Sequence, residues 1–258
     1  MKISLEGKTA WITGAGSGIG RAAVTALVKS GVRVALSGRR REPLNETLAM
    51  VQSLNGEGII AAVDVADSDA VLTAAEMIRI ELGELDILVN SAGINLPKRR
   101  YSEMKVGDWQ RVIDANLNGA YNCIHAVLPC MRDRGDGLII NVSSWAGRHD
   151  SYVAGPAYGA SKHALSSMSA TINLEEGRFG IRCCSLEPAE VATEILDRRP
   201  IPVPEEERAR MLQPDDLGET IRFIAEMPAH VCLNEVLISP TWNRSHMGGS
   251  DWFPGPPS

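Results

Sequence analysis

The sequence predicts an α/β protein with a doubly wound, seven-stranded parallel sheet and helices on both faces. Short runs of β-branched and apolar residues alternate with longer segments of helical pattern along the whole chain. Such alternation is typical of right-handed crossover connections, which place helices on both sides of a parallel sheet. The chain has 258 residues, 44% of them hydrophobic, and neither a repeat nor a low-complexity linker divides it. We therefore predict one domain over residues 1–240 and a C-terminal tail over residues 241–258.

Each predicted strand is a short run of β-branched and apolar residues. In chain order these runs are Thr9–Thr13, Arg33–Ser37, Gly58–Val63, Asp86–Asn90, Leu138–Ser143, Ile181–Leu186 and Glu235–Ile238. Segments with apolar residues at helical spacing lie between the strands. They cover residues 19–30, 42–54, 68–82, 108–134, 157–178 and 215–226.

Two segments depart from this alternation. Residues 188–214 contain four prolines and a charged run, which predicts an irregular insertion between a strand and a helix. Loops after the carboxyl ends of parallel strands line the ligand crevice, so this insertion is a candidate substrate lid, and a solvated surface loop is an equal alternative. The tail contains Trp242, Trp252 and Phe253 among glycines and prolines. Disorder and docking on a neighbouring subunit are both compatible with that composition.

Composition and charge exclude several classes of protein. The net charge of −6 argues against nucleic acid or an anionic membrane as the main partner. No apolar run reaches the roughly 18 residues that a membrane span needs, and the N-terminus lacks the apolar core of a signal peptide, so we expect a cytoplasmic location. The five cysteines form no Cys-x-x-Cys and have no zinc-ligand spacing with the five histidines. The sequence therefore predicts no metal site.

A glycine-rich segment, Thr13–Gly20, follows the first predicted strand and opens the first predicted helix. Glycines allow a tight turn and let a pyrophosphate approach backbone N–H groups, and the helix N-terminus adds partial positive charge. Because the strand, loop and helix occur in the order that the motif requires, we predict a Rossmann-like dinucleotide site and not merely a structural turn. Its predicted contacts are Gly14, Ser17, Gly18, Ile19 and Gly20.

The identity of the dinucleotide is predicted from the end of the second strand. An acidic residue about 20 positions after the glycines normally binds the ribose 2′-hydroxyl of NAD. This chain has Ser37-Gly38-Arg39-Arg40-Arg41 there, without a carboxylate. Arginine binds a 2′-phosphate in a bidentate manner, so Arg39 and Arg40 favour NADP over NAD. A basic loop that faces solvent is the alternative.

Tyr158 and Lys162 are four residues apart in a predicted helix and therefore share one helix face. A nearby positive charge favours the phenolate, so we expect the ammonium group of Lys162 to lower the pKa of Tyr158. The Tyr-x-x-x-Lys pattern is weak by itself, because any long helix can contain it by chance. The glycine-rich segment and a pair of serines, Ser143 and Ser144, precede it in a fixed order and make a catalytic site the better interpretation.

Together these motifs and their separation resemble the short-chain dehydrogenase/reductase family, specifically its short, single-domain branch, over residues 5–240. The resemblance implies an NADP- or NAD-dependent oxidoreductase. It assigns the adenine contact to Asp64, which Val65 follows. It assigns the Asn-Asn-Ala-Gly motif to the segment with Asn90, Ala92 and Gly93, in which Ser91 replaces the second asparagine. It assigns the nicotinamide carboxamide to the segment with Pro188, Val191 and Thr193, in which Ala189 replaces the usual glycine.

The same resemblance implies four catalytic residues. Reduction of a carbonyl group needs a hydride donor, a proton donor and hydrogen bonds to the oxygen. In this family pattern, Tyr158 donates or accepts the proton. Lys162 shifts the pKa of Tyr158 and binds the nicotinamide ribose, and Ser144 forms a hydrogen bond with the substrate oxygen. Asn116 occupies the position of the family's active-site Asn, which bends a long helix. The resemblance implies that Asn116 holds a water that relays the proton. Ser143, His149 and His163 are predicted to be structural or peripheral.

Residues that follow the catalytic motifs predict the substrate pocket. Its walls are expected from Ile94, Leu96, Ser144, Trp145, Tyr152, Tyr158, Ile195 and Leu196. These residues are mostly apolar, as ligand sites usually are. Positively charged side chains lie on the same loops, namely Lys98, Arg99, Arg100, Arg148, His149 and Arg198. They allow an anionic substrate, but solvated surface charge is the favoured interpretation.

Apolar stripes on helices 108–134 and 157–178 predict a homo-oligomer. The first stripe runs from Ile113 to Met131 and the second from Ala160 to Ile172. In similar proteins these two helices form the dimer interface and a homotetramer is common, so we expect a dimer or tetramer. A catalytically silent dinucleotide-binding sensor or scaffold is the alternative function, although such relatives usually lose the Tyr or the Lys. A lyase of the same fold is disfavoured by the intact glycine segment and by Lys162.

Overall fold

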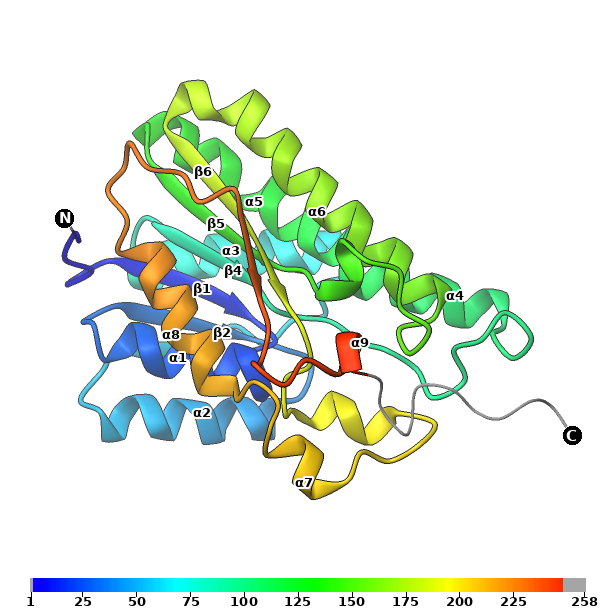
Figure 1. Ribbon diagram of the computed structural model, residues 1–258. Coiled ribbons are helices and arrows are strands. Elements are labelled where there is room, and N and C mark those ends of the chain that lie inside the picture. Colours follow the sequence, from blue (N-terminus) through cyan, green and yellow to red (C-terminus); the bar gives the residue numbers. More distant parts are fainter. Residues whose placement is uncertain (1, 248–258) are drawn as a thin grey trace, which may run out of the picture.

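A computed structural model describes residues 2–247 and contains one seven-stranded sheet (Figure 1). The strand order is β3-β2-β1-β4-β5-β6-β7, and every neighbouring pair is parallel. The strands are β1 (Thr9–Thr13), β2 (Arg33–Ser37), β3 (Gly58–Ile60), β4 (Ile87–Asn90), β5 (Gly137–Val142), β6 (Ile181–Pro188) and β7 (Glu235–Ile238). The predicted doubly wound α/β fold is therefore confirmed.

Helices cover both faces of the sheet and bury two apolar layers against it. On one face lie α1 (Gly18–Val28), α2 (Arg41–Ser53) and α8 (Pro214–Ala225), and on the other lie α3 (Ser68–Leu82), α5 (Gly119–Arg134) and α6 (Pro156–Glu176). The strands of a sheet covered on both faces read as continuous apolar runs, as β1 does, in which all five residues are buried. The apolar pattern thus reports the burial of the central strands, whereas the edge strands β3 and β7 are only partly buried.

The long predicted helix over residues 108–134 is interrupted. It consists of α4 (Val106–Ile113), a π-helical turn η1 (Asp114–Asn118) and α5. The interruption lies at Asn116, where the resemblance implied a bend, and π-helical turns are frequent at functional sites. The third strand ends at Ile60 and is shorter than predicted. Beyond it, Ala61 and Val63 each donate only one backbone hydrogen bond, to Leu36 of β2 and to Gly38.

Residues 188–214 are more ordered than the predicted irregular loop. They contain η4 (Glu194–Arg198) and α7 (Glu205–Arg208), and Val191 forms a parallel bridge with Leu212. Leu196, Val203 and Met211 pack into a small apolar cluster of their own. The segment is therefore an ordered loop with a small core of its own, and most of its residues from 197 to 210 are exposed to solvent. This segment lies beside the carboxyl ends of the strands (Figure 1).

The chain after β7 returns to this same segment. Helix α9 (Arg244–Met247) places Arg244, which is 2% exposed, beside Glu190 and Glu207. Trp242 is half exposed, with the Arg210 guanidinium 5.3 Å from its ring centroid. The predicted tail residues Trp252 and Phe253 lie outside the described residues. None of the helices within residues 2–247 is long and apolar enough to cross a membrane.

Candidate active site

The glycine turn between β1 and α1 is shaped by close backbone approaches. Gly14 and Gly18 have φ angles of 66° and 51°, which favour glycine. A Cβ atom on Gly14 would lie 2.9 Å from the backbone nitrogen of Ala92, and one on Gly20 would lie 2.3 Å from the carbonyl oxygen of Gly14. Ser17 caps α1 without a side-chain hydrogen bond, and the first turn contains no acidic residue. The free N–H groups of this helix start are therefore suited to an anionic group.

Two adjoining cavities lie at the carboxyl ends of the strands, near the point where the strand order reverses between β1 and β4. Their volumes are about 280 and 200 Å³, and they share Gly14, Ser17, Gly93, Glu194 and Ile195 as walls. Predicted residues that line the first cavity are Gly14, Ser17, Gly18, Ile19, Gly93, Ser144, Trp145, Tyr158, Lys162, Pro188, Val191, Thr193, Ile195 and Leu196. Predicted residues that line the second are Gly14, Ser17, Arg39, Arg40, Asp64, Val65, Ala92, Gly93, Ile94 and Ile195.

The remaining predicted site residues stand behind or beside these walls. Gly20 packs against the glycine turn itself. The Asn90 amide is buried and donates from Nδ2 to Oδ1 of Asn141 at 2.9 Å, which ties β4 to β5. Leu96 and Tyr152 are absent from the described walls of both cavities, and Tyr152 instead stacks against the Arg100 guanidinium, which is 3.4 Å from its ring centroid.

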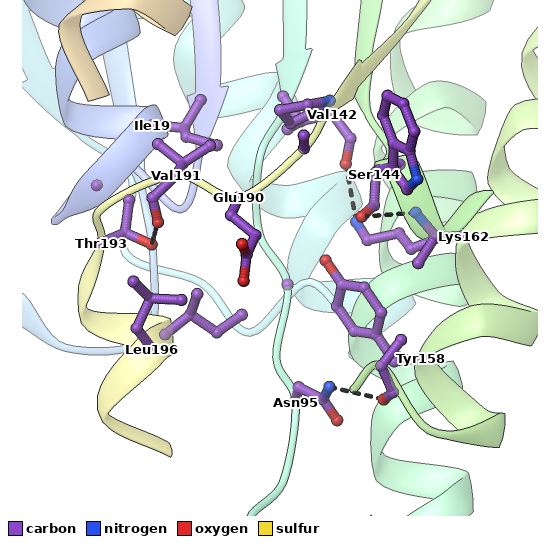
Figure 2. Close-up of a pocket in the computed structure, with 18 of the residues that line it drawn as sticks. Ile19, Asn95, Val142, Ser144, Tyr158, Lys162, Glu190, Val191, Thr193 and Leu196 are labelled. Carbon is purple, nitrogen blue, oxygen red and sulfur yellow. Dashed lines mark hydrogen bonds between the residues drawn. The ribbon is translucent and has the colours of Figure 1, made fainter. Parts of the chain in front are cut away.

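Ser144, Tyr158 and Lys162 meet in the first cavity, although they come from two different elements (Figure 2). Ser144 follows β5 and caps the short helix η2 (Trp145–Gly147), where its Oγ accepts a hydrogen bond from the Ala146 N–H at 3.1 Å. Tyr158 and Lys162 lie in the first turns of α6, with the Lys162 Nζ 5.6 Å from the Tyr158 ring centroid. The predicted shared helix face therefore points into the cavity beside the serine.

Lys162 is buried, and its Nζ donates to the carbonyl oxygen of Val142 at 2.8 Å (Figure 2). Burial lowers the pKa of Lys162 to about 8, because a charged group is poorly solvated there. The same Nζ is 3.6 Å from where a Cβ atom on Gly93 would lie. Gly93 therefore leaves open the space between the second cavity and the ammonium group.

The pKa of Tyr158 is raised, not lowered as expected from Lys162. Burial is the largest cause and raises the pKa. Hydrogen bonding with Ser144 and the charges of Arg99 and Arg199 act in the opposite direction but do not outweigh burial. The expectation failed because sequence spacing indicates which charges are near a group but not how much water the fold removes from it.

Asn116 is buried in the π-helical turn, and both polar atoms of its side chain are engaged. Oδ1 accepts a hydrogen bond from the Ile94 N–H at 2.7 Å, while Nδ2 donates to the Ile94 carbonyl at 3.0 Å and to the Ser161 Oγ at 3.2 Å. The side chain therefore joins the loop after β4 to α6. This contact holds the Gly93 backbone close to Lys162.

Four charged residues that line the first cavity were not assigned to the substrate pocket from the sequence: Arg99, Glu190, Glu194 and Arg199. Arg99 was noted only as one of several positive charges on predicted loops, and surface solvation was favoured for all of them. That interpretation is wrong for Arg99, which is 3% exposed. The Glu190 carboxylate points into the same space as the Tyr158 hydroxyl (Figure 2), and its position after Pro188 was the signal that could have found it.

The other polar groups near the site have local partners. Ser143 Oγ donates to the backbone carbonyl of Lys162 at 2.9 Å. His149 is exposed and packs against Trp145, and the exposed His163 contacts the carbonyl of Gly159. Burial raises the pKa of Cys184 to about 12, which keeps its thiol protonated and unreactive. Within residues 2–247, no group of three or more His, Cys, Asp or Glu residues is placed to hold a metal ion.

Comparison with known proteins identifies the class to which this fold and site belong. The profile of the short chain dehydrogenase family matches residues 8–201. The chain is 34% identical over 241 residues to the uncharacterized oxidoreductase SSP0419 of Staphylococcus saprophyticus, a match that covers 92% of this chain and 99% of that protein. The chain therefore belongs to the short chain dehydrogenase family, which confirms the resemblance inferred from its motifs.

Two further matches extend the comparison. The chain is 35% identical over 245 residues to the glycine betaine reductase ATRR of Emericella nidulans, covering 93% of this chain but only 19% of that much longer protein. The crystal structure of a metagenomic short-chain oxidoreductase in complex with NADP superposes with a TM-score of 0.80 at 29% identity. That match covers 93% of this chain and all of the other.

Proposed function

We propose that this protein is an NADP-dependent oxidoreductase that interconverts a secondary alcohol and a ketone or aldehyde. The observation that carries the proposal is the meeting of Ser144, Tyr158 and Lys162 in a cavity that adjoins the glycine turn. The first two can bind and protonate a carbonyl oxygen, and the third supplies a cation beside them. Membership of an oxidoreductase family and the NADP held by a structural relative support this function.

The residues present fit NADP. Gly14, Ser17, Gly18 and Ile19 line the first cavity, where a diphosphate would lie at the start of α1, and Gly20 packs beneath this turn. In the second cavity, Arg39 and Arg40 would bind the 2′-phosphate, and Asp64 and Val65 would bind the adenine. Ala92 and Gly93 would contact the ribose, with Asn90 supporting them from behind the wall. Pro188, Val191 and Thr193 would hold the nicotinamide, and Tyr158 and Lys162 its ribose.

The protein's own groups then have separable tasks. When bound, NADP supplies the hydride or accepts it. Ser144 Oγ donates a hydrogen bond to the carbonyl oxygen, and Tyr158 transfers its proton to that oxygen in reduction or removes it in oxidation. The Lys162 ammonium stabilises the phenolate left by that transfer. Asn116 positions the loop and helix that flank this proton path, and a water held there would return a proton to Tyr158 through Lys162.

The proposal is tested by following the absorbance of the reduced nicotinamide with a panel of ketones, aldehydes and secondary alcohols, each with NADP and with NAD. Binding of NADPH is measured in parallel by fluorescence. Turnover with NADP supports the proposal. Tight binding without turnover of any member of the panel would instead favour the dinucleotide-binding sensor or scaffold.

The double variant Arg39→Gln/Arg40→Gln is expected to raise the KM for NADPH by about ten- to a hundredfold, because charge-assisted bonds to the 2′-phosphate are lost. The KM for NADH should change little, since NADH has no phosphate there. Arg41→Gln is the matched control, because Arg41 is an exposed neighbour outside the described walls of the second cavity. A similar loss with both cofactors would contradict the assignment of these arginines.

We also propose that the protein forms a homo-oligomer, but without the buried residues of the stripe predicted on helix 108–134. Ala120, Ile124, Val127 and Met131 pack into the protein's own core and are not available for a partner. Large apolar side chains are exposed on the second predicted helix and at the sheet edge, with Leu174 on α6 85% exposed and Leu237 on the edge strand β7 47% exposed. Exposed apolar surface at a sheet edge is typical of association sites.

Light scattering at micromolar concentration is therefore expected to give two or four times the mass of the chain. Leu237→Lys should lower that mass, because it places a charge on the exposed edge. Leu72→Lys is the matched control, since Leu72 on α3 is 48% exposed but lies away from the edge. A monomeric mass for the unmodified protein would contradict the proposal.

A further inference from the structure

We propose that the substrate is a small hydroxy acid or oxo acid whose carboxylate pairs with Arg99 in the first cavity. This inference rests on the proposed oxidoreductase function and names the substrate class of the same site. The carboxylate is unchanged in the reaction. It serves to orient the alcohol or carbonyl carbon beside Ser144 and Tyr158.

Arg99 is held rigidly by three backbone carbonyls from three loops around the cavity. Its Nε donates to Leu96 at 2.6 Å, one terminal nitrogen to Val153 at 3.1 Å and the other to Arg198 at 2.7 Å. A guanidinium group has five N–H donors, so these bonds leave two donors without a partner among residues 2–247. A carboxylate is the ligand whose geometry matches a pair of guanidinium donors.

The charge of Arg99 is not neutralised within the described part of the chain. No carboxylate of residues 2–247 lies within 4.0 Å of its guanidinium, and backbone carbonyls carry no net charge. Burial lowers the pKa of Arg99, and the neighbouring cations Arg199 and Arg100 act in the same direction, which brings it to about 10. Arg99 therefore stays charged at neutral pH. A buried charge without a partner is unfavourable, which makes an anionic ligand the natural complement of this position.

Two carboxylates of the described residues line the first cavity. Glu194 is exposed and also lines the second cavity, whereas Glu190 is already paired. Glu190 contacts Arg199 at 2.7 Å and Arg244 at 3.3 Å. The excess positive charge therefore belongs to Arg99 and not to Arg199. Arg99 lines the same cavity of about 280 Å³ as Ser144 and Tyr158, so one small molecule could place its carboxylate on Arg99 and its alcohol beside these two residues.

The other positive side chains predicted on these loops are placed differently. Lys98 and Arg198 are exposed, Arg100 stacks on Tyr152, and Arg148 pairs with Glu235 at 2.6 Å. The first cavity has a volume of about 280 Å³ and would also receive the nicotinamide. Because ligand pockets usually measure about 300–1,000 Å³, the acid is expected to be small.

The test compares lactate, 3-hydroxybutanoate and 4-hydroxypentanoate with their methyl esters as substrates of the full chain with NADP. We expect at least one acid to have a kcat/KM about tenfold or more above that of its ester. Arg99→Gln should reduce kcat/KM for that acid by about ten- to a hundredfold, mainly through KM, because a bond to a charged group is lost. Turnover of the ester should change less than about threefold, which also shows that the variant folds.

Two further variants separate charge from structure. Arg99→Lys should retain part of the preference for the acid, because it keeps the charge without the paired donors. Lys98→Gln is the matched control, since Lys98 is an exposed neighbour in the same loop, and it should behave as the unmodified protein. An equal loss for acid and ester in Arg99→Gln would show that Arg99 only joins the loops, and would overturn the inference.

A binding measurement distinguishes failure of this inference from failure of the proposed function. Butanoate, which cannot be oxidised at an alcohol, is titrated by calorimetry into the protein saturated with NADP, and into Arg99→Gln. Turnover of esters without binding of butanoate would overturn the inference and leave the oxidoreductase function intact. Binding that Arg99→Gln abolishes, without turnover of any alcohol, would support the acid site and contradict the proposed reaction.

Discussion

Tyr158→Phe is expected to reduce kcat by about 10²–10⁴-fold, because the variant loses the group that transfers a proton to or from the substrate oxygen. The Kd for NADPH should change less than about threefold, since the ring and Lys162 remain. Stopped-flow absorbance and fluorescence titration measure the two quantities separately. Tyr121→Phe is the matched control, because Tyr121 is 56% exposed on α5 and is absent from the described walls of both cavities. Unchanged turnover in Tyr158→Phe would contradict the proposed mechanism.

The raised pKa of Tyr158 gives the pH dependence a definite sign. Alcohol oxidation requires the phenolate, so its rate should rise with pH across the range from 6 to 8, in which Lys162, with a pKa of about 8, keeps its charge. Carbonyl reduction requires the protonated phenol and should not rise over that range. The residual activity of Tyr158→Phe should no longer depend on pH in this way, because the variant has no phenol to titrate. A fall in oxidation rate with rising pH would show that another group takes the proton.

Lys162→Met is expected to abolish most turnover while making the folded protein more stable at pH 7. Burial lowers the pKa of Lys162 from 10.5 to about 8. Below pH 8 the buried charge therefore decreases the unfolding free energy of the protein by about 3 kcal/mol. Between pH 8 and 10.5 the unfolded chain binds a proton that the folded protein does not. Stability therefore rises with pH through this window, and the advantage of the methionine variant shrinks.

Denaturant unfolding at pH 7 and at pH 9.5 measures this difference. Lys29→Met is the matched control, because Lys29 is exposed at the end of α1 and its replacement should change the unfolding free energy little at either pH. A decrease in stability of Lys162→Met at pH 7 would show that the bond from Nζ to Val142 outweighs the burial of its charge. If Lys162→Met loses turnover and its folded state is more stable, the buried charge is present for function at a cost in stability.

Local patterns carried the prediction of the fold and of most candidate site residues. Burial of the central strands on two faces leaves continuous apolar runs, and a tight turn at a helix start leaves glycines at fixed spacing. Both patterns are visible without tertiary contacts. The positions of Ser144, Tyr158 and Lys162 followed from short motifs, since the carboxyl ends of parallel strands meet at one edge of the sheet. Their roles remain predictions that the variants above will test.

Other features depend on contacts between residues far apart in the chain. Asn116 bonds the backbone of Ile94 and the Ser161 side chain, and the burial of Arg99 requires carbonyls from three separate loops. Neither spacing nor residue type reports such contacts, so Leu96 and Tyr152 were placed on the pocket wall and Arg99 was assigned to solvent.

The sequence by itself determined the doubly wound sheet, the glycine turn and the family, because each depends on periodicity or on residues adjacent in the chain. Tertiary structure alone decided which charges are removed from water. That is why the pKa of Tyr158 is raised despite a neighbouring lysine, and why Arg99 is a buried cation and not a surface residue. Desolvation depends on the whole surrounding volume, and no local pattern encodes that volume.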